Sequence, residues 1–196
     1  MAKRALNKKV LIGAAAIGLA VIAAAILFLD NRGGAIEDHT DVVSASEDKG
    51  YEEVVRQYYR ATEQEDLSKL LPLYSYFLVH GADEALMQQL ESQQREYIRI
   101  MREHYGTYIL GHSIAEARLY SVREYFDLYD DAEYSRDQIE TWYEEALAYG
   151  VERYAGVVVD CTINGTQGSY SVGEFFWLVK MNGSWYIESI QELFQG

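Results

Sequence analysis

The sequence is poor in cysteine, proline and basic residues, and each shortage excludes a class of protein. One cysteine in 196 residues excludes an internal disulfide framework and any zinc site built from several cysteines. One proline excludes a long proline-rich linker. Seventeen Lys and Arg against 31 Asp and Glu give a net charge of −14, which argues against binding to the phosphate backbone of nucleic acid. Hydrophobic residues still make up 49% of the chain, enough for a folded core.

Charge is missing altogether from residues 10–29 (VLIGAAAIGLAVIAAAILFL). At about 1.5 Å per residue, a helix of this length spans about 30 Å, the thickness of the hydrocarbon core of a membrane. Four basic residues precede this segment, and mostly acidic residues follow it. The positive-inside rule therefore predicts a cytoplasmic basic segment at 1–9, a single transmembrane helix at 10–29 that serves as a signal-anchor, and an extracytoplasmic remainder.

Two alternatives to an uncleaved anchor stay open, a cleavable signal peptide and a buried soluble helix. The apolar run is longer than the usual core of a signal peptide, and its Ala23–Ala25 cluster lies inside the run rather than after it. These features favour the anchor. A lipoprotein is disfavoured because the only cysteine, Cys161, lies far from the run, and we expect this residue to be a small buried hydrophobe.

Residues 30–45 form a predicted linker, with a Gly-Gly pair, scattered acidic residues and no periodicity. Residues 46–196 form the predicted folded domain. Residues 30–196 carry all 31 acidic residues but only 13 of the 17 basic ones. An acidic surface of this kind keeps an exported domain soluble and repels anionic lipid and nucleic acid.

The domain begins with a helical pattern. Ser44 and Glu47 have the spacing of a capping box, and apolar residues then recur at helical spacing over 51–62. Asp66 is the expected N-cap of a second, short helix that Pro72 ends or kinks.

A third helix is expected to open at Asp83 and to end at Gly106, where a left-handed cap is favoured. Residues 108–120 read as a strand. Ser135 and Gln138 repeat the capping-box spacing and predict a further helix.

The C-terminal part has the pattern of strands. Residues 151–164, 171–181 and 185–190 are rich in β-branched and aromatic residues. A turn is expected at 165–168, and Asn182-Gly183 is a strong hairpin signal. Helices followed by a meander of strands predict an α+β fold with helices on one face of a curved antiparallel sheet.

Two segments resemble the nuclear transport factor 2-like superfamily. YEEVVRQYYRATEQEDLSKLLPLY, at 51–74, is similar to the first two helices of these domains, and GSYSVGEFFWLVKMNGSWYIESI, at 168–190, resembles their terminal hairpin. The similarity extends over about residues 46–194 and is greatest to membrane-anchored, exported bacterial members. It implies a cone, with a cavity between a curved sheet and its helices, and makes residues 121–150 a helical insertion.

Isomerases and cyclases of this fold place an acid or a histidine inside the cone, often beside a tyrosine. The resemblance therefore implies Asp160 and Glu174 as candidate inward acids and His112 as a candidate histidine. If the protein is an enzyme, we expect Asp160 and His112 to carry the reaction. Simple strand alternation instead places Asp160 at the surface.

The preferred interpretation is a non-enzymatic binding or interaction module. The 17 tyrosines suit contact surfaces, and we expect Tyr125, Tyr129 and Trp177 to contact a ligand or partner, with the tyrosines and Tyr134 exposed. The layout is similar to that of assembly proteins of secretion systems in the cell envelope.

A homodimer is the third hypothesis, and it requires Phe176 and Leu178 to be exposed on the outer face of the sheet. No catalytic motif, phosphate loop or calcium-loop spacing is present, so we expect no cofactor and no metal.

Overall fold

The computed structural model describes residues 49–74, 84–129 and 134–193. The predicted basic segment, transmembrane helix and linker, at 1–9, 10–29 and 30–45, lie outside these residues. In the three described stretches, no helix combines the length and the apolar character needed to cross a membrane.

Four antiparallel strands form one sheet in the order β1-β2-β3-β4. The strands are β1 (Tyr108–Tyr120), β2 (Val151–Gly165), β3 (Gly168–Met181) and β4 (Ser184–Leu193). Asn182 and Gly183 both have positive φ angles, 49° and 80°, so the β3–β4 hairpin turn has the left-handed backbone that the Asn-Gly pair predicts. The α+β prediction is confirmed.

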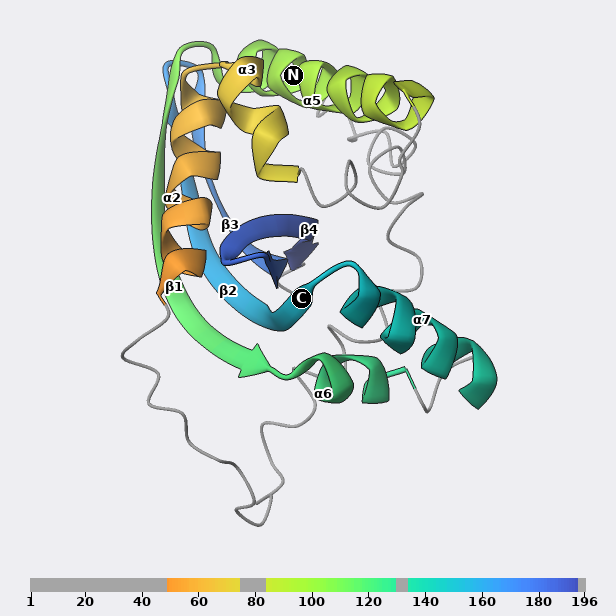
Figure 1. Ribbon diagram of the computed structural model, residues 1–196. Coiled ribbons are helices and arrows are strands. Elements are labelled where there is room, and N and C mark those ends of the chain that lie inside the picture. Colours follow the sequence, from red (N-terminus) through yellow and green to blue (C-terminus); the bar gives the residue numbers. More distant parts are fainter. Residues whose placement is uncertain (1–48, 75–83, 130–133, 194–196) are drawn as a thin grey trace.

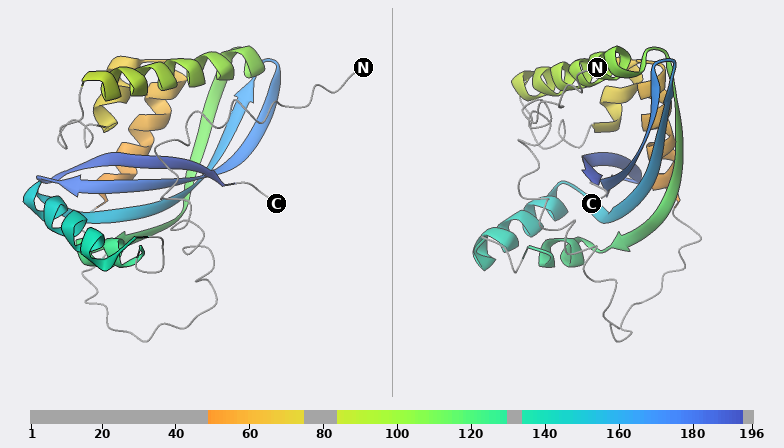
Figure 2. Two further views of the ribbon diagram at one scale, coloured as in Figure 1. Left: turned by 90° about the vertical axis from the view of Figure 1, so that its right-hand side faces the viewer. Right: turned by 180° about the vertical axis from the view of Figure 1, so that it is seen from behind.

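The helical elements lie at both ends of the sheet (Figure 1, Figure 2). In Figure 1, α3 and α5 lie at the top, α2 runs along the strands, and α6 and α7 lie at the bottom. The elements are α2 (Gly50–Glu63), α3 (Leu67–Leu70), the 3-10 helix η2 (Leu71–Tyr74), α5 (Glu84–Tyr105), α6 (Val122–Asp127) and α7 (Arg136–Ala148).

Local signals in the sequence account for most helix ends. The Asp66 side chain accepts a hydrogen bond from the backbone N–H of Ser68, and Ser135 forms a capping box at the start of α7. Gly106 follows α5 with a φ of 71°, as a left-handed cap requires. A second capping box, at Ser121, starts α6. The expected capping residue Ser44 lies outside the described residues.

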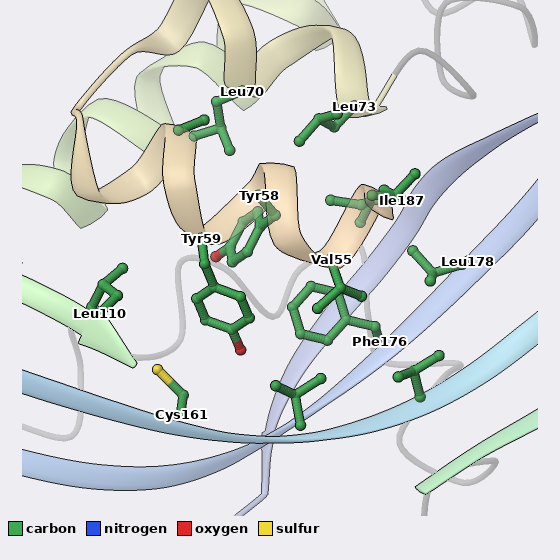
Figure 3. Close-up of a cluster of buried hydrophobic side chains, with 14 of the residues drawn as sticks. Val55, Tyr58, Tyr59, Leu70, Leu73, Leu110, Cys161, Phe176, Leu178 and Ile187 are labelled. Carbon is green, nitrogen blue, oxygen red and sulfur yellow. The ribbon is translucent and has the colours of Figure 1, made fainter. Parts of the chain in front are cut away.

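One face of the sheet, called the first face, packs against α2, α3, η2 and α5 (Figure 3). Tyr58 of α2 meets Phe176 of β3 edge to face, with ring centroids 5.3 Å apart. Alternate strand residues supply the rest of this core. Those on β2 and β3 are Ala155, Val157, Val159, Cys161, Ile163, Val172, Phe176 and Leu178.

The opposite face, called the second face, packs against α6 and α7. Tyr125 of α6 stacks on Tyr154 of β2, with ring centroids 3.7 Å apart and the ring planes 11° apart. Tyr154, Val158, Phe175, Trp177 and Val179 form its strand side.

The expectation of helices on one face only is therefore wrong, because both faces of the strands are apolar and both are covered. The expected exposure of Phe176 and Leu178 is also wrong. Both side chains have an exposed fraction of 0% because α2, α3, η2 and α5 cover their face.

Candidate functional site

A carboxylic acid is buried in the first face. Glu174 lies on β3, two residues before Phe176, and only 8% of it is exposed. The hydroxyl of Tyr59, on α2, donates a hydrogen bond to the Glu174 carboxyl group. Figure 3 shows Tyr59 extending from α2 toward the strand that carries Cys161. Sequence reasoning named Glu174 as a candidate inward acid, and the structure places it inside.

Burial raises the pKa of Glu174 to about 7, against the hydrogen bond from Tyr59, which lowers it. The charge of Glu192, the residue opposite Glu174 in the β3–β4 ladder, raises it further. The described residues contain no basic side chain that forms an ion pair with Glu174. The carboxyl group is therefore divided between its protonated and ionised forms near neutral pH.

Tyrosines from several elements interact electrostatically with this acid. Burial raises the pKa values of Tyr58, Tyr74 and Tyr97, and the charge of Glu174 raises each of them further. Tyr58 and Tyr74 are buried, whereas 36% of Tyr97 is exposed. The thiol of Cys161, on β2, is buried as expected, and its pKa is raised to about 12 by burial and by the charge of Glu174. We call Tyr59, Glu174, Cys161 and these three tyrosines the Glu174 centre.

The two residues expected to carry a reaction, Asp160 and His112, are not among these groups. Asp160 is exposed, and strand alternation places it on the second face, away from the Glu174 centre. His112 is classed as exposed but stacks on the Tyr59 ring, with centroids 4.5 Å apart. Burial of the ring, followed by the charge of Arg56, lowers the pKa of His112. His112 therefore borders the Glu174 centre, whereas Asp160 takes no part in it.

A second acid, Glu188, lies half-buried on the second face. The hydroxyl of Tyr125 donates to the Glu188 carboxyl group over 2.9 Å, and the Tyr125 and Tyr129 hydroxyl oxygens are 3.0 Å apart. Burial raises the pKa of Glu188 to about 7, against the hydrogen bond from Tyr125, which lowers it. Trp177 meets the Tyr125 ring edge to face, with centroids 5.1 Å apart. We call Tyr125, Tyr129, Trp177 and Glu188 the Glu188 centre.

Tyr125, Tyr129 and Trp177, the three residues expected to contact a ligand or partner, lie together in the structure. They lie in the core and not at the surface. Tyr125, Tyr129 and Trp177 have exposed fractions of 3%, 7% and 0%, so their expected exposure is wrong. They are covered because α6 lies on the second face rather than projecting from it. Tyr134 is half-buried and meets Tyr129 edge to face.

Sequence reasoning missed Glu188. Strand alternation places Glu188 on the face opposite Trp185 and Ile187, but no helix was expected to cover that face. The register of β4 against β3 shifts after Ile187. Among the residues described, no group of three or more His, Cys, Asp and Glu side chains is placed to hold a metal ion.

A hollow of about 320 Å³ lies away from both centres, beside α6 and α7. Arg123, Asp127, Arg136, Ile139 and Glu140 line it. Arg123 forms two hydrogen bonds of 2.8 Å with Glu140. Because Arg123 pairs with Glu140 across it, this hollow carries no argument for a ligand.

No protein-family model matches the chain, and no curated protein is significantly similar to it.

Proposed function

We propose that the protein is a single-pass membrane protein with an extracytoplasmic domain. This domain is a cone of the nuclear transport factor 2-like kind, and it binds a small ligand at the Glu174 centre. The observation that carries the proposal is the buried hydrogen bond between Tyr59 and Glu174. A core needs no carboxyl group for its stability, and a buried acid without a basic partner is costly to maintain. Such groups concentrate at binding and catalytic sites.

The chemistry of the centre favours a ligand that donates hydrogen bonds. The Glu174 carboxylate is an acceptor, and Glu192 adds a second one across the ladder. Tyr58, Tyr74 and Tyr97 add ring faces and hydroxyl groups. Tyrosine combines a large apolar surface with a polar tip, which suits the recognition of small organic molecules.

The membrane part of the proposal rests on the sequence of residues 10–29 and on the basic residues before it. Protease treatment of intact cells tests it. Digestion of the region 49–193 supports an extracytoplasmic domain. In that position the domain is available to join a larger assembly of the cell envelope. Full protection of this region contradicts that placement.

Native mass spectrometry of the full chain, extracted gently from its membrane, tests the ligand. We expect a retained small molecule in the wild type that is reduced at least several-fold in Glu174→Gln and Tyr59→Phe. Glu144→Gln is the matched control, because Glu144 is exposed on α7. Equal retention by all three variants, or none by the wild type, contradicts binding at the Glu174 centre.

An isomerase-like or cyclase-like enzyme is the second candidate, and the pKa of Glu174 near neutrality is the observation that favours it. One feature weighs against it. The Tyr59 hydroxyl already donates its hydrogen to Glu174, so it is not free to stabilise an oxyanion on a substrate. Conversion of the retained molecule by the wild type but not by Glu174→Gln would favour the enzyme over the binding module.

A further inference from the structure

We propose that the terminal half of β4, Glu188–Leu193, is a latch that is closed on β3 when Glu174 and Glu188 are protonated and released when they ionise. The released form opens the edge of the sheet beside both buried centres. The pH-dependent opening of the latch does not depend on any ligand. Only the inference that opening controls access to Glu174 rests on the proposed function.

The position of this segment makes release local. β4 is an edge strand, so its only ladder in the described sheet is the one with β3. Trp185 and Ile187, in its first half, are buried, whereas every residue from Glu188 to Leu193 is half-buried. The register shift opposite Trp177 and Leu178 falls between these two halves. The segment can therefore detach while the first half stays packed.

Unpaired polar atoms weaken the closed state. The side-chain oxygen of Ser189 and the side-chain nitrogen of Gln191 are buried without a hydrogen-bond partner. The indole nitrogen of Trp177, which lies opposite Ser189 in the ladder, is in the same condition. Each such group loses its hydrogen bonds to water on burial and regains them on opening.

Ionisation adds a second, pH-dependent cost. Glu174 and Glu192 are directly opposite each other on the first face, and like charges in such a pair are destabilising. The other titratable groups facing Glu174 are Tyr58 and Tyr59 from α2, Tyr74 from η2, Tyr97 from α5 and Cys161 from β2. His112 of β1 borders the centre through the ring of Tyr59, and burial and the charge of Arg56 lower its pKa, which disfavours its positive form. The groups that face Glu174 directly carry no positive charge.

Glu188 is held on the opposite face. Tyr125 of α6 and Tyr129, two residues past the end of α6, lie on its side, and Tyr154 of β2 stacks on Tyr125. In the region described, no basic side chain forms an ion pair with Glu188. Ionisation of both acids therefore places negative charge on both sides of the terminal half of β4, from Glu188 on the second face and from Glu174, opposite Glu192, on the first. No ion pair with a basic side chain of the described residues compensates either charge.

Hydrogen–deuterium exchange of the full chain in detergent, without added ligand, tests the latch between pH 5.5 and 8.5. Exchange is expressed as a protection factor, which removes the intrinsic effect of pH on the chemical rate. We expect the protection factors of Glu188–Leu193 to fall by about tenfold or more over this range, while those of β2 stay constant. In Glu174→Gln/Glu188→Gln the fall should be absent, and in Glu144→Gln it should match the wild type.

Tyr59→Phe gives a second measurement if the double variant does not fold. The Tyr59 hydrogen bond lowers the pKa of Glu174, so its loss should move the midpoint of opening to higher pH. The proposal is overturned if β4 protection does not depend on pH, if β2 loses protection in parallel, or if Tyr59→Phe leaves the midpoint unchanged. Failure to find a retained ligand would leave these results unaffected.

Discussion

Glu174 and Glu192 face each other across the β3–β4 ladder, two acids in register on one face of the sheet. Burial is the larger cause of the raised pKa of Glu174, and the charge of Glu192 adds to it. A cross-strand pair of like charges is tolerated where at least one member is protonated. The structure therefore has its lowest electrostatic cost below neutral pH.

The first prediction is that the domain loses stability as the pH rises. Glu174 has a pKa of about 7 when folded and an ordinary value of 4.5. The folded state therefore holds a proton that the unfolded chain has released, and the stabilisation is complete below pH 4.5 and lost as the pH rises through 7. At about 1.4 kcal/mol per unit of pKa, Glu174 alone accounts for a loss of about 3 kcal/mol.

Urea unfolding of the full chain at pH 5 and pH 8 measures this loss. Glu188 adds to it with the same sign, since its pKa is also raised to about 7. Glu174→Gln/Glu188→Gln should show a much flatter dependence. A free energy of unfolding that increases from pH 5 to pH 8 contradicts the burial of these acids in their protonated form.

A second prediction concerns the contact of Gly156 with two aromatic rings. A Cβ atom at Gly156 would lie 2.9 Å from the Cζ atom of Phe175 and 3.3 Å from Trp177. Gly156→Ala should therefore overpack the second face and cost about 1–3 kcal/mol. Gly111→Ala is the control, because its Cβ would meet only ordinary contacts at 3.8 Å or more. Equal free energies of unfolding for the two variants would show that the rings can move aside.

A third prediction is that the single thiol is inert in the folded protein. Cys161 is 4% exposed, and its pKa is raised to about 12 by burial and by Glu174. Because the thiolate is the reactive form, alkylation at pH 8 should be slow natively and rapid in 6–8 M urea, a concentration range of the order used to unfold small domains. The rate of alkylation is measured directly by intact mass spectrometry over time. Rapid native labelling would contradict the packing of α2 and α5 over β2.

Periodicity and cap chemistry predicted the helices α2, α5 and α7 and all four strands. These signals are local: the Asp66 cap, the Ser135 capping box and the Asn182-Gly183 turn each act within a few residues. The Ser121–Glu124 capping box of α6 has the same form. It starts a helix of six residues within 121–150, the segment that the resemblance made a helical insertion.

The main error was the expectation that helices cover only one face of the sheet, although the sequence contains a signal that the second face is covered. Residues 175–179 are five consecutive apolar residues, the pattern of a strand that is covered on both sides. A strand with one solvated face would alternate with polar residues. Glu188 lies on the second face by the ordinary alternation of β4, and it was missed because α6 was not expected to cover that face.

The burial of Tyr125 beneath α6 changes how the segment between β1 and β2 is understood. The resemblance described this segment as a helical insertion into a smaller domain. Deleting α6 and α7 would instead leave Tyr154 on β2 and Phe175 and Trp177 on β3 facing water, on two strands whose other side still holds the opposite core. A trimmed version of this domain should therefore aggregate rather than fold, and the two cores must melt as one unit.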